Sequence, residues 1–153
     1  MKLKSATNTD LLTLANWIPD EKSCRFWAGP GINYPFTLHS LKKDINYSRS
    51  NAFSLFDNPG NLLGFGQIIE KKDYLHLARL ITSPIHRGKG FGTILCQELI
   101  RRGKTKFGDR PFSLNVYAKN ENALSLYLKL GFTPVNIPAG FITSTDSVYM
   151  ILS

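Results

Sequence analysis

The chain has few cysteines and lacks any long apolar run. Cys24 and Cys96 are the only cysteines among 153 residues, and Cys96 lies within a predicted helix, so we expect two buried thiols rather than a disulfide framework. No apolar run reaches the roughly 18 residues that a membrane span needs. The first residues also lack the apolar stretch of a signal peptide. We therefore expect a cytoplasmic protein with no membrane partner.

Several catalytic patterns are also missing. The sequence has no Gly-x-Ser-x-Gly nucleophile pattern, and His39, His76 and His86 lack metal-ligand spacing, so we expect no metal. Acidic residues number 11 against 19 lysines and arginines, which gives a net charge of +8. This excess suits an anionic ligand or a nucleic acid. The aromatic residues that RNA readers interleave on a basic sheet are absent, so we expect no nucleic-acid partner.

The pattern of apolar residues predicts one α/β domain over residues 1–153, with the element order β-α-α-β-β-β-α-β-α-β-β. Hairpins followed by a β-α-β crossover imply a mixed sheet with helices on both faces. The strands at 75–82 and 112–117 become candidates for parallel neighbours. The other strands are expected at 3–6, 52–56, 62–69, 132–137 and 147–152. Two helices are expected to follow the caps at 7–9 and at 37, a third to follow the glycines at 88–92 and end at about 107, and a fourth to span 120–130. Residues 24–36 are expected to form a loop.

A glycine-rich segment between a strand and a helix is the most informative feature. It reads Arg87-Gly88-Lys89-Gly90-Phe91-Gly92-Thr93. The glycines let a ligand approach the backbone, and the helix start adds about half a positive charge, so the segment predicts a phosphate site. It is not a P-loop, because Ser83 stands where that motif needs glycine, and its last glycine comes too early for a dinucleotide motif.

A second segment lies downstream, after a further predicted strand. It reads Asn120-Glu121-Asn122-Ala123-Leu124-Ser125-Leu126-Tyr127-Leu128-Lys129-Leu130-Gly131-Phe132. Asn120 is a good helix N-cap, and Glu121 lies where the helix dipole favours an acid. Lys129 lies in the last turn, and Gly131 can adopt the left-handed conformation that ends a helix.

Together the two segments resemble the signatures of the GNAT superfamily of N-acetyltransferases, and the resemblance covers nearly the whole chain. It implies a GNAT fold whose strands 75–82 and 112–117 splay apart, with acetyl-CoA as co-substrate and its pantetheine arm in the gap. Backbone groups in the gap can pair with the arm because they lack ladder partners. The coenzyme-binding residues that the resemblance implies are Leu80, Ile81, Thr82, Arg87, Gly88, Lys89, Gly90, Phe91, Gly92, Thr93, Asn115, Asn120, Tyr127 and Lys129.

The implied activity is acetyl transfer to a primary amine by direct attack in a ternary complex. The thioester is already activated, so the protein must position both reactants and supply a general acid. Tyr127 matches the family's acid, although its spacing also fits core packing. The general base stays open between His76, Glu70 and ordered water, because the strand at 74–82 contains no acidic residue.

The acceptor site is expected near Arg79 and the aromatic residues Trp27 and Tyr34. Arg79 can bind a carboxylate or carbonyl of the acceptor, or it can be an exposed arginine. The aromatic residues can form the wall of a pocket or belong to the core. Because acids are few, we expect a single amine such as an amino acid or a chain N-terminus rather than a polycation.

An alternative function and the oligomeric state stay open. A non-catalytic coenzyme A sensor or partner-binding module is favoured by the missing acid and disfavoured by Tyr127. A homodimer is one option for the assembly.

Overall fold

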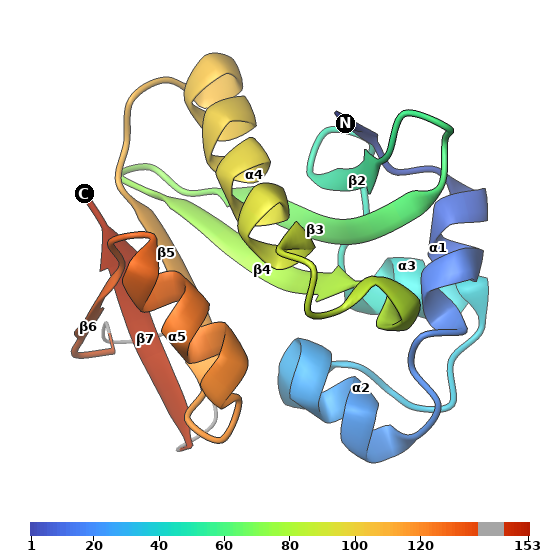
Figure 1. Ribbon diagram of the computed structural model, residues 1–153. Helices are drawn as coiled ribbons and strands as arrows, with labels where there is room; N and C mark the ends of the chain where they lie inside the picture. Colours follow the sequence, from blue (N-terminus) through green and yellow to red (C-terminus); the bar gives the residue numbers. More distant parts are fainter. Residues whose placement is uncertain (138–145) are drawn as a thin grey trace.

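The computed structural model describes residues 1–137 and 146–153. Its centre is a seven-stranded mixed sheet in the order β1-β2-β3-β4-β5-β7-β6 (Figure 1). The strands are β1 (Lys2–Ser5), β2 (Ala52–Phe56), β3 (Leu62–Glu70), β4 (Leu75–Thr82), β5 (Phe112–Tyr117), β6 (Thr133–Val135) and β7 (Ser147–Leu152). The helices are α1 (Asn8–Ala15), α2 (Glu21–Ala28), α3 (Leu38–Asp44), α4 (Phe91–Phe107) and α5 (Glu121–Lys129), and two 3₁₀ turns span Gly29–Gly31 and Pro84–His86.

The sheet opens between β4 and β5. These strands pair in parallel only from Leu75↔Phe112 to Leu77↔Leu114, whereas β4 continues along β3 to Thr82 and β5 continues along β7 to Tyr117. The later halves of β4 and β5 therefore do not pair with each other. This fork confirms the expected splayed parallel pair.

Two hydrophobic clusters cover the two faces of the sheet. One packs Leu77, Leu95 and Leu114 with α4, and residues of α5 pack against it. The other joins Phe65 of the sheet to the buried residues of α1, α2 and α3. Helices on both faces were expected, and this part of the fold is confirmed.

The expected loop over residues 24–36 is wrong at its start, where the structure has helix α2. Asp20 caps this helix by accepting a hydrogen bond from the Ser23 amide at 2.7 Å. Gly29, with φ of 75°, ends it. Cys24 is buried on the inner face, and the outer face is exposed. The aromatic residues of the helix and the glycines that follow it give residues 24–36 the composition of a loop, and the Asp20 cap lies before that segment.

Candidate functional site

The glycine segment forms an open backbone cradle at the start of α4. Gly88 and Gly90 have φ of 78° and 85°, and Gly90 is the helix N-cap. In the described part of the chain, no acceptor bonds the amides of residues 87–93, and the first helical bond runs from Ile94 N–H to the Gly90 carbonyl. A Cβ on either glycine would meet nothing within 4 Å. The cradle can thus hold an anion against free N–H groups, and the exposed side chains of Arg87 and Lys89 add charge.

Close packing ties this cradle to α5. A Cβ on Gly92 would lie 3.0 Å from Leu126 Cδ1, so the missing side chain lets the start of α4 approach the side of α5. Asn120 caps α5 by accepting from the Ala123 amide at 3.4 Å, as expected. Lys129 is exposed in the last turn. The loop and the second segment thus form one structural unit.

The C-terminal end of α5 holds Tyr127. Gly131, with φ of 102°, ends the helix, and Phe132 N–H donates to the Tyr127 carbonyl at 3.0 Å. This is a Schellman ending, which brings the side chain of Phe132 back onto the helix. The two rings meet edge to face, with centroids 6.0 Å apart.

The Tyr127 hydroxyl is kept protonated. Burial raises the pKa of Tyr127 well above its ordinary value, and nearby Cys96 raises it further. Within the described residues, nothing hydrogen-bonds this hydroxyl. The side chain both packs against the core and carries a proton at neutral pH, so its two sequence interpretations are compatible.

The opposite face of the fork carries a polar row. His76 Nδ1 and Ser113 Oγ are 2.8 Å apart, and the His76 ring stacks on Tyr149 at 6.5 Å. Burial lowers the pKa of His76 to about 4, and the charges of Lys71 and Arg79 contribute. Asn115 Oδ1 is buried and has no partner among the described residues. His76 is therefore neutral at pH 7 and a weak base.

Arg79 lies at a bulge in β4 and is not the exposed arginine that was one alternative. Its φ is 56°, and the pairing of β3 and β4 shifts register there. Nη1 donates to Gln67 Oε1 at 2.8 Å, Nε is buried without a partner in the described residues, and burial lowers the pKa of the guanidinium. The Arg79 carbonyl accepts from Trp27 Nε1 at 2.9 Å, which anchors α2 on the bulge.

The structure does not bring the remaining candidates to the fork. Glu70 pairs with Leu75 at the β3–β4 hairpin and forms an ion pair with Arg110 at 2.8 Å. Tyr34 donates to the Ile18 carbonyl at 3.4 Å. Both Tyr34 and Trp27 pack against the α1–α3 cluster, which favours the core alternative for these aromatic residues.

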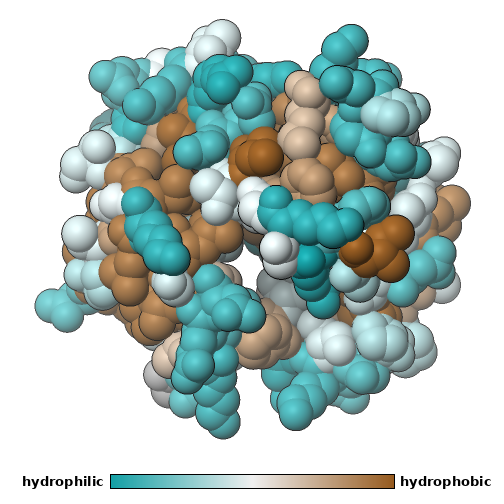
Figure 2. Space-filling model, viewed as in Figure 1, coloured by the Kyte–Doolittle hydropathy of each residue, from teal (hydrophilic) through white to brown (hydrophobic). Residues whose placement is uncertain are grey.

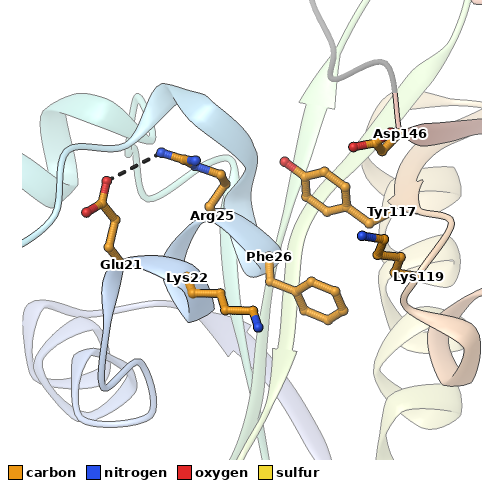
Figure 3. A pocket seen from close by; sticks show the side chains of 7 residues that line it. All are labelled: Glu21, Lys22, Arg25, Phe26, Tyr117, Lys119 and Asp146. Carbon is orange, nitrogen blue, oxygen red and sulfur yellow. Dashed lines mark hydrogen bonds and ion pairs between the residues drawn. The ribbon is translucent and has the colours of Figure 1, made fainter.

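A pocket of about 530 Å³ opens between α2 and the end of β5 (Figure 3). The rings of Phe26 and Tyr117 line it and stack on each other, with centroids 5.9 Å apart and planes at 6°. Figure 2 shows the molecule hollowed between α5 and α2, with hydrophilic side chains on much of the rim. The lining residues are Glu21, Lys22, Arg25, Phe26, Tyr117, Lys119 and Asp146. Sequence reasoning missed this set; the alternation from Asn115 to Tyr117 was the available signal.

The sequence profile described as the acetyltransferase (GNAT) family matches residues 13–132. The chain belongs to this family. The uncharacterised N-acetyltransferase YobR of Bacillus subtilis is 33% identical over 84 residues, which are 55% of this chain and 33% of YobR. The chain thus spans only a third of that relative.

Solved structures of GNAT enzymes share the whole fold. Spermidine N-acetyltransferase from Vibrio cholerae, in complex with CoA and spermine, aligns with a TM-score of 0.77 at 21% identity, over 99% of this chain and 94% of that one. The ribosomal-protein-S18-alanine N-acetyltransferase from Escherichia coli aligns with a TM-score of 0.69 at 22% identity, over 99% and 92%. By their names, these two GNAT proteins use different acceptors, so the shared fold does not select between them.

The structure also addresses membrane spans and metal groups. No helix within residues 1–137 and 146–153 is long and apolar enough to cross a membrane. In the same residues, no three histidine, cysteine or acidic side chains gather in a way that could hold a metal ion.

Proposed function

We propose that this GNAT protein is an acetyl-CoA-dependent N-acetyltransferase that transfers the acetyl group to a primary amine by direct attack in a ternary complex. The observation that carries the proposal is the fork between β4 and β5, which has a free amide cradle beside it and Tyr127 on the face of α4 and α5. In this proposal a thioester in the fork meets Tyr127 on one face of the sheet and the acceptor amine on the other.

The chain's own groups fit the coenzyme. The free amides at residues 88–93 suit its pyrophosphate, and Arg87 and Lys89 lie on the same exposed segment. The edge of β4 over Leu80–Thr82 faces the gap and offers backbone groups to the pantetheine amides. Asn120 and Lys129 lie at opposite ends of the adjoining helix α5; Asn120 is proposed to bond the coenzyme, and Lys129 to reach its nucleotide phosphate.

The chemistry needs one acid and no strong base. The amine nitrogen forms the new C–N bond, the C–S bond breaks, and the departing thiolate takes the Tyr127 proton; a proton equivalent to the one that the amine loses then restores the Tyr127 phenol through water. The surplus amine proton leaves through water, because His76 is a weak base and Glu70 is tied to Arg110. The burial that keeps His76 neutral also favours the uncharged, nucleophilic form of an amine at the fork.

We place the acceptor in the pocket on Phe26 and Tyr117 and propose that it is a single amine next to a carbonyl or carboxylate. The lining has three cationic and two acidic side chains, which is a poor match for a polyamine. Arg79, with its buried Nε free of partners in the described region, is the proposed partner for the acceptor's oxygen. A polyamine acceptor, as named for the Vibrio cholerae neighbour, is the rival.

The test is acetyl-CoA-dependent release of free thiol with a panel of amines at equal concentration. Phenylalanylglycine and single amino acids are expected to react faster than spermidine and kanamycin, and Arg79→Ala is expected to reduce only the former activities. Faster reaction of the polycations would refute the proposed acceptor. Coenzyme binding without turnover of any amine would favour the sensor alternative.

A further inference from the structure

Asn115 stands at the point where the sheet opens. It follows Leu114, the last residue of β5 that pairs with β4. Phe112, Leu114 and Val116 are buried in the cluster under α4 and α5. Because side chains alternate along a strand, Ser113, Asn115 and Tyr117 lie on the other face, toward α2. The Phe26–Tyr117 stack shows directly that this face meets α2.

The side-chain oxygen of Asn115 lacks the donor that a buried oxygen requires. Oδ1 is buried and unpartnered within the described residues, although Ser113, two positions earlier, is hydrogen-bonded to His76. Leaving a buried acceptor unpaired costs about 1–3 kcal/mol. A ligand with an N–H group would remove this penalty, and a primary amine carries such a group.

We propose that Asn115 positions the acceptor amine: its Oδ1 accepts an N–H bond at the fork, while the rest of the acceptor lies along β5 in the Phe26–Tyr117 pocket. The inference rests on the proposed function and moves Asn115 from the coenzyme, where the family resemblance had placed it, to the acceptor. With one N–H bond directed to Oδ1, the nitrogen lone pair is free to point into the gap. Tyr127 then meets the leaving thiolate from the α5 face.

The spacing along β5 also limits the acceptor. Alternate residues of a strand are about 6.6 Å apart, so the amine at Asn115 and the group resting on Tyr117 are separated by about that length. A peptide N-terminus or an amine with a flat group near the nitrogen fits this separation. Three of the charged residues at the pocket, Lys22, Lys119 and Asp146, lie beyond the fork, next to Tyr117 and Phe26.

The test compares Asn115→Leu, Asn115→Asp and the control Asn16→Leu, which alters an exposed asparagine at the end of α1. The probes are phenylalanylglycine and spermidine. Initial rates are measured while the concentrations of the amine and of acetyl-CoA are each varied, and the CoA-induced shift in Tm is measured in parallel. For Asn115→Leu we expect kcat/KM for the reacting amine to fall about 10–100-fold, equivalent to one hydrogen bond of about 1–3 kcal/mol. The KM for acetyl-CoA and the CoA-induced shift should stay close to those of the wild type.

Asn115→Asp keeps an acceptor oxygen and is expected to restore most of the lost kcat/KM, whereas Asn16→Leu should have no effect. A rise in the KM for acetyl-CoA in place of the amine effect, or an unchanged Asn115→Leu enzyme, would overturn the inference and leave the proposed function intact. If Asn115→Leu does not fold, failure of the folded Asn115→Asp variant to retain amine turnover overturns it equally. A wild-type protein that shows no CoA shift, or acetylates neither probe, would refute the proposed function as well.

Discussion

Replacing Gly90 with valine should remove coenzyme binding while leaving a folded protein. Gly90 has φ of 85°, and a Cβ there would project into open space at the amide cradle. A branched side chain would occupy the space that a pyrophosphate needs. A non-glycine residue in the left-handed region costs about 1–2 kcal/mol, which for a domain of this size lowers Tm by about 2–8 °C.

The rise in Tm that acetyl-CoA induces is the more specific signal, because it reports coenzyme binding directly. A ligand at 100 times its dissociation constant stabilises the native state by about 2.7 kcal/mol, so wild-type Tm should rise by about 5–10 °C. In Gly90→Val this rise should vanish. The assay is thermal unfolding followed by fluorescence or circular dichroism, with acetyl-CoA titrated to saturation of the wild-type shift.

Gly60→Val is the matched control. Gly60 has φ of 99° and equally open surroundings, but it lies in the turn between β2 and β3. It should lower Tm of the free protein by a similar amount and keep the full coenzyme shift. A wild-type protein that acetyl-CoA does not stabilise, or a Gly90→Val variant that keeps the shift, would show that the cradle does not bind the coenzyme.

Two further substitutions test the two faces of the fork. Tyr127→Phe should keep the packing against Phe132 and leave Tm nearly unchanged, because the hydroxyl has no hydrogen bond within the described residues. Turnover should fall on the order of 10²-fold. Unchanged turnover would show that Tyr127 serves packing alone. The folded state holds the pKa of His76 at about 4, below the ordinary 6.5. Between pH 6.5 and pH 4 the unfolded chain therefore binds more protons than the folded protein. The free energy of unfolding should fall as the pH drops through this range, by about 2 kcal/mol at pH 5 relative to pH 8. Urea unfolding at the two pH values should show this loss reduced in His76→Gln, and an equal pH dependence in the variant would contradict the role of burial.

The parts of the site that depend on local sequence could be predicted. Gly88 and Gly90 adopt positive φ because the turn into α4 requires it, and Asn120 and Gly131 cap the two ends of α5 as expected. Each of these conformations depends on residues within a few positions along the chain. The splayed pair was also expected, although only through the resemblance to a family.

The features that depend on distant strands could not be predicted. Whether Arg79 is exposed depends on a register shift between β3 and β4, which brings it to Gln67 twelve residues away. The pairing of Glu70 with Arg110 joins residues 40 positions apart. Helix α2 contributes only Cys24 as a buried residue, and Trp27 and Phe26 contact Arg79 of β4 and Tyr117 of β5, so its place against the sheet depends on residues far along the chain.

The polar row on the α2 side of the fork argues for a catalyst rather than a coenzyme sensor. A sensor needs only the amide cradle at the start of α4 and the unpaired edge of β4. It has no use for a buried, unpartnered Oδ1 at Asn115, which lowers stability unless a donor arrives. Nor does it need a neutral, desolvated environment such as the one that shifts His76. An amine, by contrast, must shed its proton before it attacks a thioester, and the burial that disfavours a positive charge on His76 acts in the same way on an amine beside it. The absence of an acidic residue from β4 is therefore consistent with turnover.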